Sequence, residues 1–137
     1  MDSLNLFFFY SFKAYENRLD SDKFVESDID PELLFNIPFT GNVKLKGLII
    51  IGSNNEEHPR SVRLFKNRPK MSFDDVSASP DQEFILEKDP YGTMEYNTKV
   101  VTFNNVHHLS LYFPENFGGI KTRICYIGLR GEFSEGI

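Results

Sequence analysis

Residues 35–52 read FNIPFTGNVKLKGLIIIG and carry the strongest strand signal in the sequence. From Val43 onward apolar and polar residues alternate, and neighbouring residues of a strand point to opposite faces. The alternation predicts one face of Val43, Leu45, Gly47, Ile49 and Ile51 and an opposite face of Lys44, Lys46, Leu48 and Ile50. Both faces are apolar over residues 48–51. We therefore expect a strand that begins at a solvated rim and ends covered on both sides, as in the middle of a sandwich.

Five further stretches have strand character, and turns rich in Gly, Asn, Asp and Pro separate them. They are residues 61–67, 83–86, 99–103, 106–113 and 122–130. We also expect turns at residues 40–42 and 52–55, and a helical turn at residues 30–34 that ends before Pro38. Many short strands, without an amphipathic helix of about ten residues, predict an antiparallel β-sandwich or barrel.

Composition limits the classes of protein that the chain can form. Its 137 residues suit one domain with a buried core, and 14 Phe and 6 Tyr lead us to expect an aromatic core. A net charge of -5 argues against a nucleic-acid or anionic-membrane surface, because such surfaces need clustered Lys and Arg. The single cysteine, Cys125, excludes an internal disulfide and a four-cysteine zinc site. No stretch approaches the length of a transmembrane helix.

The histidines form no metal-binding or catalytic pattern. His107 and His108 are neighbours in a predicted strand, so they point to opposite faces and cannot easily share a ligand. His58 follows two glutamates, a combination that can bind zinc, but it lacks a second histidine nearby. For His58 we therefore favour a solvated loop.

The acidic residues give no stronger signal. Asp74, Asp75 and Asp81 offer oxygen atoms to calcium, but the spacing of a hand-type calcium loop is absent. The sequence also has no nucleophile elbow, phosphate loop or metalloprotease motif. It therefore predicts no catalytic residues, no metal and no cofactor, in a protein that is not an enzyme.

Five stretches follow one another in an order and spacing that we recognise. They are KFVESDIDPELLFNIPFTGNVKLKGLIIIG (23–52), HPRSVRLFKNRPKMSFDD (58–75), PDQEFIL (80–86), FNNVHHLSLYFPENFGG (103–119) and TRICYIGLRGEF (122–133). Together they resemble the PITH domain, a module found at the C-terminus of thioredoxin-like protein and alone in single-domain proteins. The resemblance covers about residues 11–133 and is closest to the single-domain members.

The resemblance implies an antiparallel jelly-roll β-sandwich of the galactose-binding-like kind. We expect a short irregular N-terminal segment at residues 1–22 and the PITH domain at residues 23–137, shortened at both ends relative to the family. A missing outer strand would leave an unpaired sheet edge. The aromatic run at residues 6–10 could pair there as a substitute, because aromatic residues suit strands.

The resemblance also implies a protein-interaction module without catalytic residues. In thioredoxin-like protein this module associates with the regulatory particle of the proteasome, so we expect a protein partner, with the proteasome as the first candidate. We expect a monomer in the cytoplasm and nucleus that binds neither nucleic acid nor membrane. Since strands supply the scaffold, the contact surface should lie on the loops at residues 54–60 and 71–81. There we predict His58, Arg60, Asp74 and Asp75 as partner-binding residues.

A lectin-like jelly roll that binds a ligand is the alternative. Sugar sites commonly stack a ring on an exposed aromatic side chain beside Asp, Asn or Arg. Tyr91, Tyr96 and Phe117 lie in predicted loops and could serve in this way. Only analogy of fold supports this reading.

Overall fold

The computed structural model describes residues 6–10 and 15–133, and for residues 6–10 it describes the backbone alone. The strands are β1 (Leu6–Tyr10), β2 (Val25–Glu26), β3 (Leu33–Gly52), β4 (Ser61–Lys66), β5 (Gln82–Ile85), β6 (Tyr96–Asn97), β7 (Val106–Phe113) and β8 (Arg123–Phe133). Two short 3-10 helices, η2 (Tyr15–Asn17) and η3 (Phe73–Asp75), lie in the connections. In the described part of the chain, no helix is long and apolar enough to cross a membrane.

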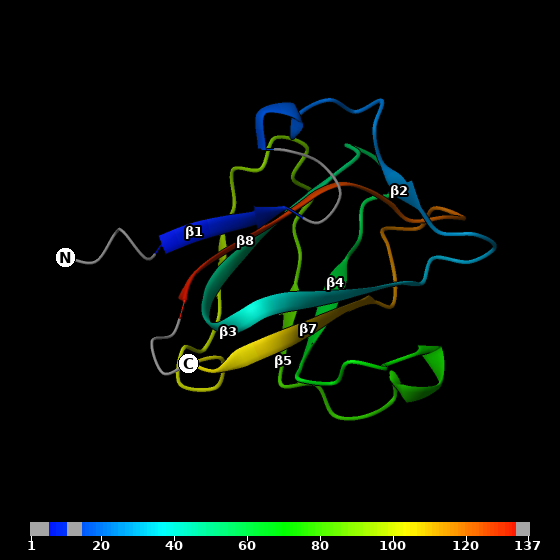
Figure 1. Cartoon of the computed structure of the whole chain (residues 1–137). Helices are drawn as coiled ribbons and strands as arrows, with labels where there is room; N and C mark the ends of the chain where they lie inside the picture. Colours follow the sequence, from blue (N-terminus) through cyan, green and yellow to red (C-terminus); the bar gives the residue numbers. More distant parts are fainter. Residues whose placement is uncertain (1–5, 11–14, 134–137) are drawn as a thin grey trace.

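The long strand β3 belongs to both layers of the sandwich (Figure 1). The strands pair antiparallel in the order β1-β8-β3-β7-β4-β5, with β2 beside β8 and β6 beside β3. From Leu33 to Pro38, β3 pairs with β7, and from Val43 to Gly52 it pairs with β8. The ladder with β7 is interrupted between Pro38 and Val43. At this irregularity β3 passes from one layer into the other, as bulged strands commonly do at corners.

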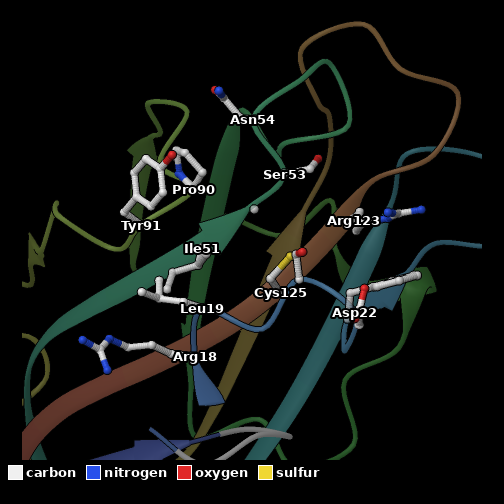
Figure 2. Close-up of a pocket in the computed structure, with 13 residues that line it drawn as sticks. Arg18, Leu19, Asp22, Ile51, Ser53, Asn54, Pro90, Tyr91, Arg123 and Cys125 are labelled. Carbon is white, nitrogen blue, oxygen red and sulfur yellow. The ribbon is translucent and has the colours of Figure 1, made fainter. Parts of the chain in front are cut away.

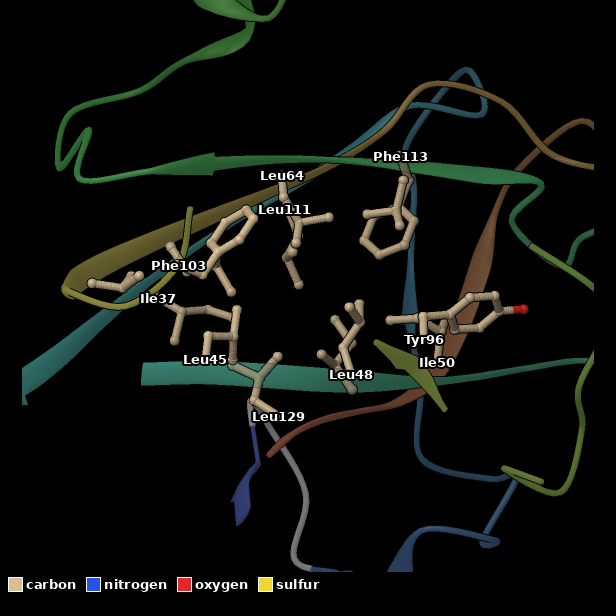
Figure 3. Packing of buried hydrophobic residues seen from close by; sticks show 14 of the residues in the cluster. Ile37, Leu45, Leu48, Ile50, Leu64, Tyr96, Phe103, Leu111, Phe113 and Leu129 are labelled. Carbon is tan, nitrogen blue, oxygen red and sulfur yellow. The ribbon is translucent and has the colours of Figure 1, made fainter. Parts of the chain in front are cut away.

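The core lies between the two layers (Figure 3). Leu45 and Leu48 of β3 lie opposite Leu64 of β4 and Leu111 and Phe113 of β7, and all five side chains are fully buried. The prediction that aromatic side chains dominate the core is wrong. Among the described residues of this cluster, buried aliphatic side chains outnumber the buried aromatic ones, which are Tyr96, Phe103 and Phe113.

A single-residue bulge in β3 changes which side chains point inward. Lys46 has no paired residue on β8, because the register shifts by one residue there. Beyond the bulge, Leu48 and Ile50 enter the core together with Leu45, whereas Ile51 packs in a separate cluster. The predicted division of β3 into two faces is therefore wrong beyond Leu45, since one inserted residue reverses the alternation.

The entry into β3 also differs from the prediction. Residues 30–34 form no helical turn: the Asp30 carboxylate accepts a hydrogen bond from the Glu32 N–H (3.0 Å), and β3 begins directly afterwards. An aspartate can close such a local turn with the same side-chain oxygen that would cap a helix. The turn predicted at residues 40–42 is wrong as well, because these residues lie within β3. Pro38 stands next to the irregularity, where a strand tolerates proline.

Residues 99–103 form a turn, so the strand predicted there is wrong. The N–H groups of Thr102 and Phe103 both donate to the Lys99 carbonyl, at 2.9 and 3.0 Å. The Phe103 side chain is fully buried, and its carbonyl accepts the N–H of Leu45 (2.9 Å). Val100 and Val101 favour a strand, but the buried ring of Phe103 fixes this segment as a turn.

β1 lies at one edge of the sheet, antiparallel to β8 (Figure 1). The pairing runs from Leu6 opposite Glu132 to Tyr10 opposite Gly128. The prediction of an irregular segment over residues 1–22 is therefore wrong for residues 6–10, and the pairing expected for this aromatic run is confirmed. Residues 1–5 and 11–14 lie outside the described residues.

Candidate functional site

A pocket of about 560 Å³ opens where the end of β3 meets β8, the segment after η2 and the turn at residues 89–92 (Figure 2). Its floor is apolar, since Ile51 and Cys125 are almost fully buried and Gly52 has no side chain. The other lining residues are Arg18, Leu19, Ser21, Asp22, Phe24, Ser53, Asn54, Pro90, Tyr91 and Arg123. This volume, and an apolar floor with polar groups around it, are typical of ligand sites. We call this site the Tyr91 pocket.

A buried histidine holds the turn that carries Pro90 and Tyr91. The ring of His58 is fully buried: its Nδ1 lies 2.7 Å from the Pro59 carbonyl, and its Nε2 accepts the N–H of Asp89 at 2.9 Å. These contacts assign the proton to Nδ1, which donates to the carbonyl. Burial lowers the pKa of His58 below its usual 6.5, against the raising effects of both backbone contacts and the Asp89 carboxylate. The neutral ring can therefore keep Nε2 as an acceptor.

The carboxylate of Asp89 fixes the other end of the same turn. It is buried and accepts hydrogen bonds from the Thr93 N–H (2.9 Å), the Thr93 hydroxyl (3.2 Å) and the Met94 N–H (2.9 Å). Gly92, with a φ of 72°, supplies the left-handed conformation that the turn requires. The backbone of the turn that carries Tyr91 is thus fixed, and 67% of the surface of Tyr91 is exposed at the pocket.

Two arginines border the Tyr91 pocket, and an aromatic ring supports each of them. The guanidinium carbon of Arg18 lies 3.9 Å from the centre of the Tyr15 ring, and that of Arg123 lies 3.9 Å from the centre of the Phe24 ring. Such stacking holds a guanidinium in one orientation. Arg123 also pairs with the carboxylate of Glu26 at 3.3 Å. The rim therefore combines aromatic surface with positive charge.

The lining suits binding better than reaction chemistry. Among the described residues, no group of three or more His, Cys, Asp or Glu side chains could hold a metal ion. Asp22 is the one carboxylate in the lining, and the lining contains no histidine beside Cys125. A nucleophile and its general base therefore do not meet among these lining residues.

His58 does not lie where the sequence predicted. We expected a solvated loop residue that touches a partner, but the ring is fully buried behind Gly52. A Cβ atom on Gly52 would lie 2.6 Å from the His58 ring, so only glycine leaves room for it. The surface prediction for His58 is wrong, because a contact with Asp89, 31 positions later, draws the ring inside. His58 does not line the Tyr91 pocket, and it acts on the pocket only by holding the turn that begins at Asp89.

The other three predicted residues come before and after β4 in the sequence. Arg60 precedes the strand and is exposed, with its guanidinium carbon 5.9 Å from the centre of the Phe117 ring. Asp74 and Asp75 lie in η3 after the strand, where the Asp75 carboxylate accepts the Ser72 N–H (2.9 Å) and closes the cap. η3 packs against the sheet through the rings of Phe73 and Tyr112, whose centres are 6.3 Å apart. The role of Arg60, Asp74 and Asp75 in partner binding stays a prediction.

No local signal predicts the Tyr91 pocket as a whole. Its lining comes from four separate stretches, residues 18–24, 51–54, 90–91 and 123–125. The single clue in the sequence is the turn at residues 89–92, which exposes a tyrosine between a proline and a glycine.

Comparison with known structures defines the class of protein. A crystal structure of an F5/8 type C domain from Bacteroides fragilis matches with a TM-score of 0.50 and 11% sequence identity, over 98% of this chain and 96% of that chain. At this identity the likeness shows the fold alone. The protein is an antiparallel jelly-roll β-sandwich of the galactose-binding-like kind, and the predicted fold class is confirmed.

The sequence matches the PITH domain over residues 3–136, and the chain belongs to the PITH domain family. A PITH domain-containing protein of Drosophila pseudoobscura pseudoobscura is 67% identical over 124 residues, which are 90% of this chain. PITH domain-containing protein 1 of Homo sapiens is 58% identical over the same share of the chain. The matched region spans 59% of the length of each relative.

Proposed function

We propose that the chain is a non-catalytic protein-interaction module that associates with the regulatory particle of the proteasome. Membership of the PITH domain family carries the proposal, because the resemblance to the module of thioredoxin-like protein points to this partner. The chain acts as a monomer in the cytoplasm and nucleus, and it binds neither nucleic acid nor membrane. A preformed pocket with exposed aromatic surface is consistent with a binding role.

Affinity capture tests this function. The tagged chain is incubated with cytosol, and captured proteins are identified by mass spectrometry. We expect enrichment of subunits of the proteasome regulatory particle over a capture with the tag alone. Repeated captures that enrich no proteasome subunits would contradict the proposal.

The same capture tests the surface residues predicted from the sequence. Arg60→Glu reverses a charge before β4, and Asp74→Lys reverses one in η3. Both side chains are exposed, so neither change should unfold the domain. If the predicted residues bind the partner, these variants recover less of it than the unchanged chain. Full recovery by both variants would discard this choice of surface.

The second candidate function is a lectin-like ligand-binding module. The observation that favours it is the exposed ring of Tyr91, which borders the pocket together with Asn54 and Asp22. Binding to a glycan array that is lost in Tyr91→Ala would support this function. An array without any binding would remove it.

A further inference from the structure

We propose that the Tyr91 pocket receives an extended peptide segment of the partner protein. This segment places an aromatic or branched aliphatic side chain over the floor formed by Ile51 and Cys125, and a carboxylate beside Arg18. The inference rests on the proposed function, since it requires a protein partner, and it assigns that function to a surface and a chemistry.

Three exposed apolar side chains border the Tyr91 pocket. Leu19 is 53% exposed and Phe24 is 38% exposed, and both line the pocket together with the exposed ring of Tyr91. Figure 2 shows Leu19 beside Ile51 at the base of the pocket, with Pro90 and Tyr91 on the wall above. Exposed apolar groups that converge on a concavity are the usual mark of a contact surface, and a buried aromatic anchor is its usual energetic centre.

One arginine of the rim, Arg18, offers a place for a carboxylate of the partner. The whole chain carries a net charge of -5, yet the lining of the pocket has two arginines and one carboxylate, Asp22. The carboxylates of Glu26 (3.3 Å) and Glu57 (3.6 Å) lie against Arg123 and offset its charge. Arg18 instead stacks on the Tyr15 ring and donates to the Tyr15 carbonyl (3.1 Å). No ion pair of Arg18 is found among the described residues, so a carboxylate of the partner complements Arg18 rather than Arg123.

The floor favours a peptide over a sugar. A sugar exposes hydroxyl groups on most of its surface, and each one that is buried needs a hydrogen-bond partner. The floor offers Ile51, Gly52 and the thiol of Cys125, while Ser53 and Asn54 stand beside it. An apolar side chain has no hydrogen bond to lose when it is buried on such a floor. The amide groups of an extended chain can form hydrogen bonds with the polar groups of the rim.

The walls of the pocket are formed before any ligand binds. The His58–Asp89 contact and the hydrogen bonds of the Asp89 carboxylate hold the turn with Tyr91. On the opposite side, the stacking of Arg123 on the Phe24 ring holds the second wall. A preformed site avoids much of the entropy that ordering a loop would cost, so a short segment can bind measurably.

Peptide display on phage tests the inference. The full chain is immobilised, random-sequence peptides are selected on it, and the affinity of the most enriched peptide is measured by fluorescence anisotropy. We expect the enriched peptides to share an aromatic or branched aliphatic residue next to Asp or Glu. Tyr91→Ser and Arg18→Glu should each weaken binding by about tenfold or more, as loss of a central anchor does. Arg18→Lys should retain part of the affinity.

Matched controls lie outside the pocket. Ile85→Ser removes an apolar side chain that is 70% exposed on β5, and Arg68→Glu reverses an exposed charge after β4. Both should bind the peptide as the unchanged chain does. Selection of peptides without the acidic and apolar pair, no enrichment, or equal binding by Tyr91→Ser and the controls would overturn the inference. Glycan binding that is lost in Tyr91→Ser, without peptide enrichment, would assign the pocket to a sugar and would overturn it too.

Affinity capture separates this inference from the proposed function. If Tyr91→Ser and Arg18→Glu capture proteasome subunits as well as the unchanged chain does, the function stands and the assignment to the Tyr91 pocket fails. If neither the unchanged chain nor the variants capture these subunits, the proposed function itself fails.

Discussion

At the scale of single residues, His58 links two loops through one hydrogen-bond acceptor. Its Nε2 accepts the N–H of Asp89, and the turn that follows carries Tyr91. The acceptor exists only while the ring is neutral, and burial favours the neutral ring by lowering the pKa. Protonation of His58 would replace the acceptor with a donor facing the Asp89 N–H, and the contact would break.

Stability should therefore fall on mild acidification. Because the pKa of His58 lies below its usual 6.5 in the folded chain, the unfolded chain takes up a proton at a pH where the folded chain does not. Burial and the neighbouring His107 lower the pKa of His108 as well, so both groups act in the same direction. We expect the free energy of unfolding, measured by urea denaturation, to decline as the pH falls from about 7 to about 5.

A pair of variants assigns this effect to its source. His58→Gln should show a weaker dependence on pH, because it removes a group whose pKa differs between the two states. His107→Gln changes an exposed side chain and should keep most of the dependence. An unchanged chain with constant stability over this range, or the same slope in His58→Gln, would contradict the role given to His58.

The ring of Phe113 should account for a large share of the stability of the core. It is fully buried between the layers, and it meets the Phe35 ring edge to face with 5.9 Å between the ring centres. We expect Phe113→Ala to lower the free energy of unfolding by about 3–5 kcal/mol, the cost of the lost burial and of the cavity. Ile85→Ala, on an exposed side chain, should change it by about 0.5 kcal/mol or less. Equal losses of unfolding free energy in the two variants would contradict this role of Phe113.

At the scale of elements, the alternation of apolar residues predicts the strands that the core holds. β7 has the predicted bounds, and β4 and β8 begin within one residue of them. Each of these strands carries apolar side chains at every second position, so local pattern and tertiary packing agree. They disagree at residues 99–103, where the pattern of a strand occurs in a turn that is anchored by the buried ring of Phe103.

The bulges could not be predicted from one strand alone. A bulge is a mismatch between two paired strands, so it depends on residues that are distant in sequence. Lys46 is the extra residue in β3, and Cys125 is the extra residue in β8, where Ile51 pairs with Tyr126 and Gly52 with Ile124. Each insertion reverses the alternation that follows it. The division of β3 into faces is therefore wrong after the first bulge.

Removing the inserted residue should cost little stability, because it leaves a regular strand with the same core face. Without Lys46, only Gly47 separates Leu45 from Leu48, so Leu45, Leu48 and Ile50 still point to one face and keep their partners on β8. We expect a loss well below the roughly 3–6 kcal/mol that turning two buried aliphatic side chains outward would cost. The measurement is urea denaturation followed by circular dichroism.

The control is Lys46→Ala, which keeps the bulge. It removes the ion pair between Lys46 and Glu132 (2.7 Å), and such solvent-accessible pairs contribute little. We expect a small change in stability. A deletion variant that loses about 3–6 kcal/mol or fails to fold, while Lys46→Ala does not, would contradict this assignment of Lys46 as the extra residue.

The pairing of β1 with β8 should protect an edge of the sheet. Five residues of β1 stand opposite residues 128–132 of β8, and their removal would leave that edge unpaired. We expect deletion of residues 1–10 to lower the melting temperature and to increase aggregation, whereas deletion of residues 1–5 alone should have a smaller effect. Thermal denaturation and light scattering measure both. The same melting curve for the two truncations would contradict a stabilising role of β1.

At the scale of the whole molecule, resemblance predicts more than residue pattern does. The fold class and the family follow from stretches spread over the whole sequence, and both are confirmed. The Tyr91 pocket does not follow from them, because four separate stretches meet there only after folding. The predicted partner-binding residues were chosen by loop and charge alone. Loop position and charge do not reveal the burial of His58, which depends on its contact with Asp89.

Direct titration of the purified chain with purified proteasome regulatory particle tests the central claim. The chain is labelled with a fluorophore, and anisotropy is followed as the particle is added, with unlabelled chain as competitor. We expect saturable binding that the unlabelled chain displaces. A signal that does not saturate, or that an excess of unlabelled chain leaves unchanged, would contradict it.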